Sequence, residues 1–307
     1  MNVFIAADDN YIYPAKVMLT SFFANNPQGP HHIYFMCSAL KGENLAELET
    51  LVKKNGAEFI PQKITEESFE GFVVTDRFPA EVYFRFLAAH LLPAEEERAL
   101  WLDVDLIVNQ SLDAFYNIDL NGKAFAACES IGDHSHILAK LGCMEHAVYI
   151  NSGVLLINAN QMRRYGIKEY FDYYKKHSEV IVWPDQDILN GLFENHMLIL
   201  SNQKYNVQIL NGRFPSREEI RALEDNASII HFVGYYKPWH REYTNPCAVI
   251  WDRYHAKLFG KGSTYLLKRC LNRWIWRRIR LPFRAFRGEL YTKSVFLRRL
   301  RNVFRKS

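Results

Sequence analysis

The sequence predicts an α/β fold with a mostly parallel β-sheet and helices on both of its faces. Between residues 3 and 108, short apolar runs of strand length alternate with segments of helical periodicity. This order is typical of parallel sheets that are covered on both sides. The chain has 307 residues, of which 49% are hydrophobic, so it can bury a large core. We find no internal repeat and no GxGxxG or GxxxxGK[ST] loop for a dinucleotide or a P-loop nucleotide.

The first half of the chain supplies four predicted strands. Residues 3–7 form a buried strand that ends at the polar turn 8–10, and a helical pattern continues to about Asn25. The strand signals are β-branched and aromatic runs, and the helix signals are apolar residues spaced three and four apart. The next predicted elements are a strand at 32–37, a helix at 45–54, a strand at 57–60, a helix at 82–92 and a strand within 99–108.

The second half continues the sheet. Further strands are predicted at 124–128, 147–158 and 229–233, with helices near 168–177 and 185–193. Ligands of open α/β sheets bind at the carboxyl ends of the strands. Asp8 and Asp103 both fall at such an end, so we expect a site there.

The cysteines and the N-terminus predict a cytoplasmic protein. The five cysteines are odd in number, far apart and without a CxxC spacing, which argues against both a disulfide framework and a zinc site. The opening MNVFIAADD turns acidic before the apolar region of a signal peptide develops. No run of about 18 apolar residues is present to span a bilayer.

Charge divides the chain into an acidic body and a basic tail. Residues 261–307 contain 15 Lys or Arg and one acid, Glu289, whereas the rest contains 23 basic and 33 acidic residues. The segment 260–263, with two glycines, suits a flexible connection. We therefore expect a main domain at 1–260 and a separate tail at 261–307.

The tail predicts attachment to a membrane surface. On a helical wheel, Leu, Ile, Trp and Phe of the tail lie on one side and Lys and Arg mostly around them, although Arg278 falls on the apolar side. Basic amphipathic helices of this kind lie in the lipid interface. We expect a basic helical C-terminal tail that binds an anionic membrane surface, which places the protein peripherally on the inner face of the cell membrane. A helical tail packed on the acidic body is the alternative.

The segment ALWLDVDLIV, residues 99–108, places Asp103 and Asp105 in an apolar run. An ionised carboxylate removed from water needs a cation or several donors. Residues two apart on an extended chain point to the same side about 6.5–7 Å apart, so both carboxylates can bind one divalent ion that also holds phosphate oxygens. A D-x-D pair also arises by chance, and two solvated aspartates at a strand end are the alternative.

The segment HFVGYYKPW, residues 231–239, follows a predicted strand. Imidazole beside carboxylates suits Mn²⁺ or a similar ion, so His231 is a candidate ligand. Gly234 lets the backbone approach a phosphate, and Lys237 supplies a positive charge for it. A loop histidine and a surface lysine are the alternative.

Five segments in this order resemble glycosyltransferase family 8, especially its bacterial lipopolysaccharide α-glycosyltransferases: FIAADDNY, LDVD, NSGVLLIN, DQDILN and HFVGYYKPW. The similarity covers roughly residues 1–255. It implies a GT-A fold with a Rossmann-like sheet. It also implies a retaining hexosyltransferase that moves galactose or glucose from UDP-galactose or UDP-glucose to a hydroxyl of a saccharide acceptor. Lipopolysaccharide or another lipid-linked glycan is the expected acceptor, and Mn²⁺ or Mg²⁺ the expected cofactor.

The resemblance also assigns roles to single residues. Asp103, Asp105 and His231 match the family's metal ligands, and Gly234 and Lys237 match the residues that hold the diphosphate. The remaining donor contacts that it implies are Asp8, Asn10 and Tyr11 for uridine, Arg85 for the donor, Asn151 and Gly153 for the sugar, and Asp185 with Gln186 beneath the sugar. Helix N-caps are the alternative at Asp8 and Asp185.

The sequence leaves alternatives for the reaction mechanism and for the residues that bind the acceptor. The metal and Lys237 stabilise charge on the leaving diphosphate. Retention of the anomeric configuration can follow from double displacement through Asp185. It can also follow from attack of the acceptor on the face that the diphosphate leaves, with Gln186 or a backbone carbonyl stabilising the positively charged sugar. We favour the second mechanism. Glu129 is the candidate acidic residue on the acceptor side. An inactive nucleotide-sugar-binding protein and a tail-mediated nucleic-acid binder are alternative functions; the acidic body argues against a nucleic-acid partner.

Overall fold

The computed structural model describes residues 1–75 and 78–260, so the predicted tail at 261–307 lies outside the described residues. The described chain divides into two compact units. The first comprises Met1–Ile209 and Ser216–Val233, and the second comprises Leu210–Pro215 and 234–260. Over the part of the chain that is described, no helix has the length and apolarity needed to cross a bilayer.

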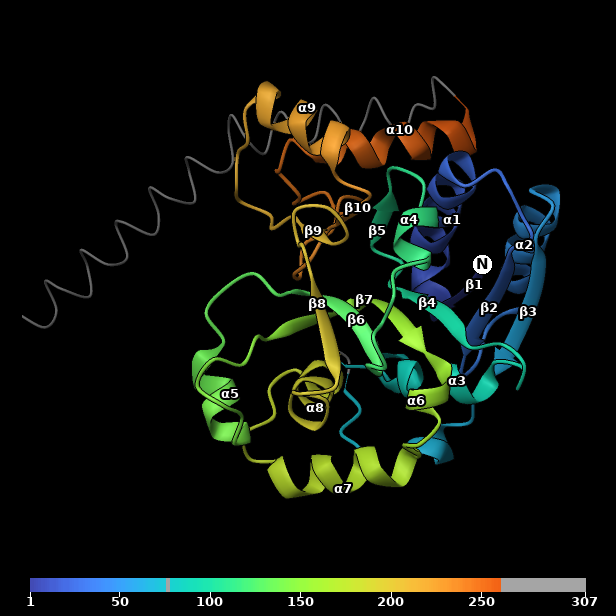
Figure 1. The fold of residues 1–307 in the computed structure, drawn as a ribbon. Helices are drawn as coiled ribbons and strands as arrows, with labels where there is room; N and C mark the ends of the chain where they lie inside the picture. The colour runs from blue at the N-terminus through green and yellow to red at the C-terminus, as the bar shows by residue number, and fades with distance from the viewer. Residues whose placement is uncertain (76–77, 261–307) are drawn as a thin grey trace, which may run out of the picture. The chain divides into compact units, whose positions relative to one another are not determined.

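A seven-stranded sheet forms the centre of the first unit (Figure 1). Its strand order is β3-β2-β1-β4-β7-β6-β8. Neighbours are parallel except at β7, which is antiparallel to both β4 and β6, so the prediction of a mostly parallel sheet is confirmed. The strands are β1 (Asn2–Ala6), β2 (His32–Cys37), β3 (Glu58–Lys63), β4 (Arg98–Leu102), β6 (Phe125–Glu129), β7 (Ile150–Asn158) and β8 (Met197–Leu200).

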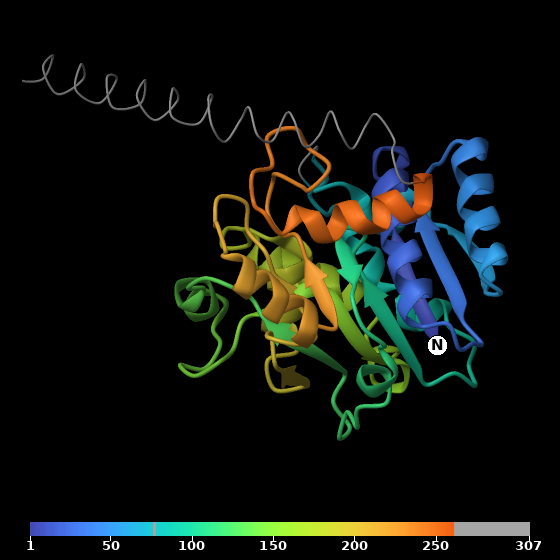
Figure 2. The same cartoon turned by 90° about the horizontal axis from the view of Figure 1, so that it is seen from above.

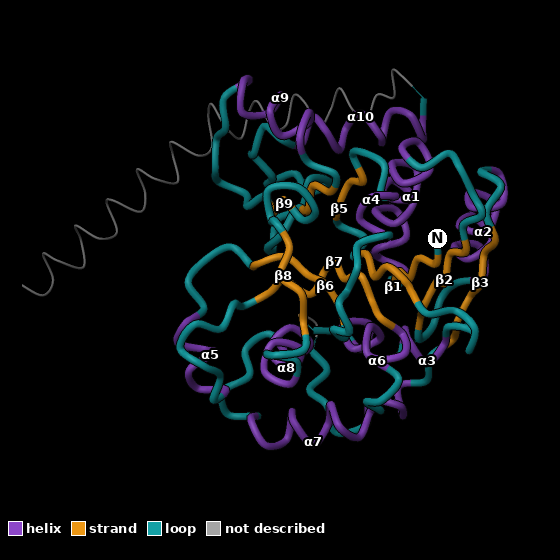
Figure 3. Tube along the Cα trace, in the orientation of Figure 1, coloured by secondary structure: helices purple, strands orange, loops and turns teal. Residues whose placement is uncertain are grey.

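Helices cover both faces of this sheet (Figure 3). Successive residues of β1 point to opposite faces: Val3 and Ile5 join one apolar cluster and Phe4 joins the other. Figure 2 shows the first face, which carries α1 (Ile12–Asn25) and α2 (Gly42–Lys54). The second face carries η3 (Ala80–Phe86), α3 (Ala88–Leu91), α6 (Ala159–Met162), α7 (Ile167–His177) and α8 (Pro184–Leu192).

A second sheet of three short strands lies in the same unit. In it, β10 (Ile229–His231) pairs antiparallel with β5 (Leu106–Val108) and parallel with β9 (Val207–Gln208). His231 lies opposite Leu106 on one side and Gln208 on the other. This pairing brings the end of β10 beside Asp105.

Shorter elements connect these layers. The 3₁₀-helices η1 (Asp9–Tyr11) and η2 (Glu66–Phe69) precede α1 and η3. The first unit also contains α4 (Asp113–Tyr116), α5 (Ser135–Leu141) and α9 (Arg217–Asn226), and the second unit contains α10 (Ala248–Phe259). None of α4, α5, α6, α9, α10, β8 and β9 was predicted.

The single helix predicted at 82–92 was wrong. The chain instead forms the 3₁₀-helix η3 and then the short α3. Aromatic side chains lose rotamer freedom in an α-helix, and here Tyr83, Phe84 and Phe86 are fully buried in the core. The Arg85 side chain also donates from Nε to the Val82 carbonyl at 2.9 Å, which holds the guanidinium against this turn.

The single strand predicted within 99–108 was also wrong. It is two strands, β4 and β5, which belong to different sheets. Val104 and Asp105 form a turn between them. Asp103 and Asp105 are therefore brought together by a turn and not by the pleat of one extended strand.

Candidate active site

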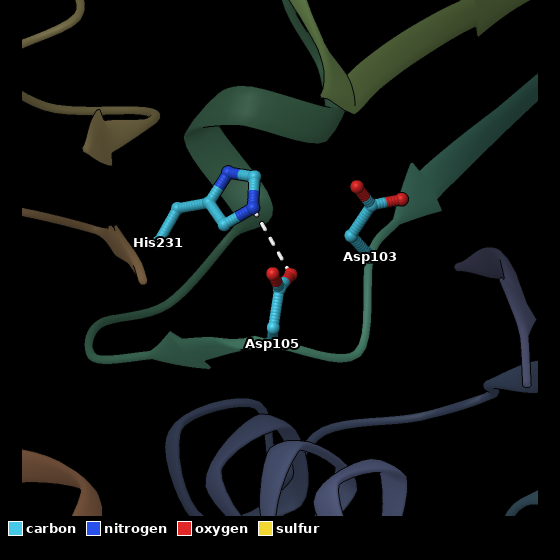
Figure 4. A group of neighbouring side chains, drawn as sticks. All are labelled: Asp103, Asp105 and His231. Atoms are coloured by element: carbon cyan, nitrogen blue, oxygen red, sulfur yellow. Dashed lines mark hydrogen bonds and ion pairs between the residues drawn. The ribbon is translucent and has the colours of Figure 1, made fainter. Parts of the chain in front are cut away.

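Three predicted metal ligands meet where the two sheets adjoin. Asp103 follows β4, Asp105 precedes β5 and His231 ends β10. One ligand atom from each lies within 4.8 Å of those of the other two. Figure 4 shows the imidazole of His231 facing the carboxylates, with Nε2 3.0 Å from Asp105 Oδ1. The site is half-open, because the Asp103 side chain is 28% exposed and that of His231 only 3%.

This donor set fits a divalent ion such as Mn²⁺. Carboxylate oxygens suit Mn²⁺ and Mg²⁺, and imidazole suits softer ions of the first transition row. Gly153 keeps the space between the ligands open. A Cβ built on Gly153 would lie 2.5 Å from His231 Cε1 and 2.6 Å from Asp103 Oδ2. No larger residue fits at this position without moving a ligand.

Gly153→Ala is therefore expected to lower the affinity for Mn²⁺ by about 10- to 100-fold, the range found when groups around metal ligands are disturbed. The added methyl group would displace His231 or Asp103. Titration of Mn²⁺ followed by electron paramagnetic resonance (EPR) measures the effect. Gly42→Ala is the matched control, since its Cβ would meet no atom within 4 Å. Equal affinity in both variants would contradict the role of Gly153.

Arg85 links the metal cluster to helix α8. Its Nη2 donates to Asp103 Oδ1, and its Nη1 lies near Asp185 Oδ2, both at 3.1 Å. Nη1 also donates to the Ser152 carbonyl at 2.5 Å, and the guanidinium lies over the Trp101 ring. Arg85 is only 6% exposed. The planar guanidinium thus holds two carboxylates at once, which a lysine could not do with the same geometry.

Asp185 lies in the first turn of α8, which begins at Pro184 with Trp183 as its N-cap. The alternative of Asp185 as the N-cap was therefore wrong. Burial raises the pKa of Asp185, and the positive charge of Arg85 opposes that rise. Ser152 Oγ donates to Asp185 Oδ2 at 2.7 Å. Oδ2 of this carboxylate therefore contacts both Arg85 and Ser152.

The sugar-contacting candidates form a hydrogen-bonded network. Asn151 Nδ2 donates to Gln186 Oε1 at 3.1 Å, and the Ser152 backbone N–H donates to the same oxygen at 3.2 Å. Asn206 donates from Nδ2 to Asn151 Oδ1 at 2.9 Å, and its Oδ1 lies 3.0 Å from His231 Nδ1. Asn206 was not predicted as a site residue, because it belongs to no recognisable motif.

Three other residues of the site were also missed. Trp101 Nε1 donates to Asp103 Oδ1 at 2.9 Å. Ser152, described above, lies within the NSG segment. Asp187 is fully buried, and it accepts from the Tyr149 hydroxyl and the backbone N–H groups of Val182 and Trp183. Its position in the DQD segment was the one sequence feature that could have indicated Asp187.

The uridine candidates form a second group, at the carboxyl end of β1. Asp8 is the N-cap of η1, and its Oδ1 accepts from the backbone N–H groups of Asn10 and Tyr11 at 2.9 and 3.1 Å. Its Oδ2 accepts from Asn10 Nδ2. The capping role is therefore confirmed. Because β1 pairs in parallel with β4, Asp8 and Asp103 end neighbouring strands.

The remaining candidates are Gly234, Lys237 and Glu129. Gly234 and Lys237 belong to the second unit, where Gly234 has a φ of 88°, in the left-handed region that favours glycine. Glu129 ends β6 and is exposed, and Gln208 Nε2 donates to its backbone carbonyl at 2.8 Å.

Comparisons with known proteins agree with the geometry. A model of the family described as "Glycosyl transferase family 8" matches residues 2–243. A lipopolysaccharide 1,2-glucosyltransferase of Escherichia coli is 27% identical over 248 residues, covering 78% of this chain and 73% of that protein. General stress protein A of Bacillus subtilis is 25% identical over 277 residues, covering 86% and 95%. A lipopolysaccharide 1,3-galactosyltransferase of Salmonella typhimurium is 24% identical over 248 residues, covering 78% and 73%.

Solved structures support the same fold. The crystal structure of the galactosyltransferase LgtC in complex with donor and acceptor sugar analogs superposes with a TM-score of 0.72 at 24% identity. The match covers 88% of this chain and 100% of that chain. The predicted GT-A fold is thus confirmed.

Proposed function

The chain belongs to glycosyltransferase family 8, and on that basis we propose that it transfers galactose or glucose from a UDP-sugar to a saccharide hydroxyl with retention of configuration. The convergence of Asp103, Asp105 and His231 within 4.8 Å carries the proposal. Two carboxylates and an imidazole on a half-open site suit an ion that must also bind a diphosphate.

The metal ligands and the residues near the diphosphate would stabilise the negative charge on the leaving diphosphate. Asp103, Asp105 and His231 would hold Mn²⁺ or Mg²⁺. The bound cation would supply positive charge for the departing diphosphate. Lys237 would add a second positive charge, and Gly234 would let the backbone approach the phosphates; both assignments rest on the HFVGYYKPW segment.

The burial of Asp185 favours attack of the acceptor on the face that the diphosphate leaves. A nucleophilic carboxylate must reach the anomeric carbon, whereas Asp185 is only 7% exposed and its Oδ2 is paired with Arg85 and Ser152. Gln186 is more exposed, and its Oε1 is oriented by two donors. We assign Gln186 to steadying the positive sugar and Asp185 to positioning, with double displacement through Asp185 as the alternative.

The uridine would bind at the β1 turn. Both carboxylate oxygens of Asp8 already accept hydrogen bonds within the turn. Asp8 would therefore shape this site, while Asn10 and the 38% exposed Tyr11 would contact the nucleoside.

Lys237→Ala is expected to weaken UDP binding in the presence of Mn²⁺ by about 10- to 100-fold, because a charge-assisted contact to phosphate contributes roughly 1.5–3 kcal/mol. Calorimetry with UDP, with and without Mn²⁺, measures this. Lys257→Ala, an exposed lysine of the same unit, is the control. Equal binding of UDP and GDP would refute base recognition at the β1 turn.

A lipid-linked glycan such as lipopolysaccharide is the proposed acceptor. Two of the relatives above are named as lipopolysaccharide transferases. The composition of 261–307 supports a membrane-surface tail beside a catalytic domain at 1–260. This would place the protein at the cytoplasmic face of the cell membrane, with Glu129 as the acidic candidate on the acceptor side.

The full chain is expected to float with anionic vesicles and not with neutral ones. Each Lys or Arg near an anionic surface contributes on the order of 1 kcal/mol, so a third of the 15 in the tail suffices for firm binding. Raising the salt concentration should weaken the binding. Flotation of the full chain on a density gradient is the measurement. Absence of flotation at low salt would favour a tail packed on the acidic body.

A further inference from the structure

We propose that Asn206 is a positioning residue, which holds His231 for metal binding through Nε2 and connects that ligand to Gln186. The inference rests on the proposed function, because it takes His231 as a metal ligand. It adds a residue outside the five segments that resemble the family.

Asn206 is completely buried and directly precedes β9, which runs parallel to β10 and pairs Gln208 with His231. Its side-chain amide has a polar partner on each side: Oδ1 lies 3.0 Å from His231 Nδ1, and Nδ2 lies 2.9 Å from Asn151 Oδ1. A buried primary amide held on both sides has one orientation, since reversing it would break both contacts.

The network itself determines that orientation. Asn151 Oδ1 also accepts the Gly153 backbone N–H at 3.2 Å, so this oxygen is the acceptor side of Asn151. Asn206 must then offer its NH₂ group to Asn151 and its carbonyl oxygen to His231. His231 Nδ1 therefore faces an acceptor.

An acceptor at Nδ1 is what a histidine needs in order to bind a cation through Nε2. The neutral imidazole carries one proton, and a partner that accepts it at Nδ1 leaves the Nε2 lone pair for the metal. Such partners also fix the plane of the ring. In this structure His231 Nε2 points toward Asp105, on the side of the metal cluster.

The Asn206 amide also orients the residues proposed to contact the sugar. Asn151 presents Oδ1 to Asn206 and Nδ2 to Gln186 Oε1. If Asn206 stops donating, Asn151 Oδ1 loses the shorter of the two hydrogen bonds that set the direction of its amide. A reversed Asn151 would face Gln186 Oε1 with its own oxygen and displace it. Asn206 thus couples the orientation of His231 to that of Gln186.

The test compares two variants of the full chain. Asn206→Ala removes both contacts, whereas Asn206→Asp keeps an acceptor for His231 Nδ1 but removes the donor to Asn151. Titration of Mn²⁺ alone, followed by EPR, should show an affinity about 10- to 100-fold lower for Asn206→Ala, and near the wild-type value for Asn206→Asp. UDP-sugar hydrolysis should give a kcat about 10- to 100-fold lower for Asn206→Asp at saturating Mn²⁺, because Gln186 is misplaced.

Asn26→Ala controls for a general loss of stability. Asn26 is a buried asparagine of the same unit, whose amide accepts from the Leu112 N–H and donates to the Phe22 carbonyl. This variant should lower the melting temperature as Asn206→Ala does, and leave Mn²⁺ affinity unchanged.

Each contrary outcome is distinct. A wild-type chain that binds no Mn²⁺ overturns the metal assignment and this inference with it. Wild-type affinity in Asn206→Ala, or an equal loss of affinity in Asn26→Ala, overturns the positioning of His231 alone. Wild-type kcat in Asn206→Asp overturns the coupling to Gln186.

Discussion

Asp105→Asn is expected to lower the rate of hexose transfer by about 100- to 1,000-fold. Enzymes lose this much when one group that stabilises charge in the transition state is removed. Asp103→Asn should have the same effect. Asparagine keeps the shape of each side chain but removes the negative charge that attracts the cation. The two carboxylates and His231 are the three side chains of the cluster, so the loss of either carboxylate leaves an incomplete set.

Initial rates with a UDP-sugar and Mn²⁺ measure this effect. A chelator should abolish the activity, and Mn²⁺ should restore it better than Ca²⁺, which prefers six to eight oxygen ligands. Asp133→Asn is the control, since Asp133 is an exposed carboxylate whose side chain bonds to Ser135. Full activity in Asp103→Asn or Asp105→Asn would refute the metal assignment.

Arg85→Met is expected to lower the free energy of unfolding by about 3–5 kcal/mol, because it leaves buried charge without its partner. Arg85 joins Asp103 and Asp185, which would then face each other without a cation between them. Activity should fall as well, since Asp103 would lose a contact that orients it.

The pH dependence of Arg85→Met identifies the cause. Burial already raises the pKa of Asp185, and Arg85 is the largest opposing influence, so its removal raises that pKa further. A carboxyl whose pKa is raised by folding favours the folded state below its unfolded pKa, about 4, and loses that contribution as the pH rises. The destabilisation should therefore be largest near pH 7 and shrink toward pH 4.

Urea unfolding of wild type and Arg85→Met across this pH range checks the prediction. Arg164→Met, at an exposed arginine of the same unit, should change stability little at any pH. A destabilisation that is independent of pH would show that Arg85 acts through packing on Trp101 and not through the carboxylates.

The alternation of apolar runs predicted most of the large sheet, because strands buried on both faces carry a strong signal. β2 was predicted with its observed bounds, and α7 and α8 within one residue. The antiparallel direction of β7 was not predictable, since a strand buried on both faces reads alike in either direction. β9 has only two residues and lacks any periodicity that could reveal it.

The site was predictable where short segments carry a motif, and not where distant residues meet. Asp103, Asp105 and His231 were predicted together, and the structure brings them together. Asn206 reaches His231 across 25 residues and Asn151 across 55, through the pairing of β9 with β10. No local pattern records such a contact.

The proposed retaining transfer is tested most directly by time-resolved proton NMR of UDP-galactose and UDP-glucose incubated with the full chain and Mn²⁺, with water as the acceptor. A retaining transferase should release UDP together with a hexose that appears first as the α-anomer, and the Asp105→Asn variant should release both about 100- to 1,000-fold more slowly. First appearance of the β-anomer would contradict retention. Absence of UDP release from either donor would instead identify a nucleotide-sugar-binding protein without turnover.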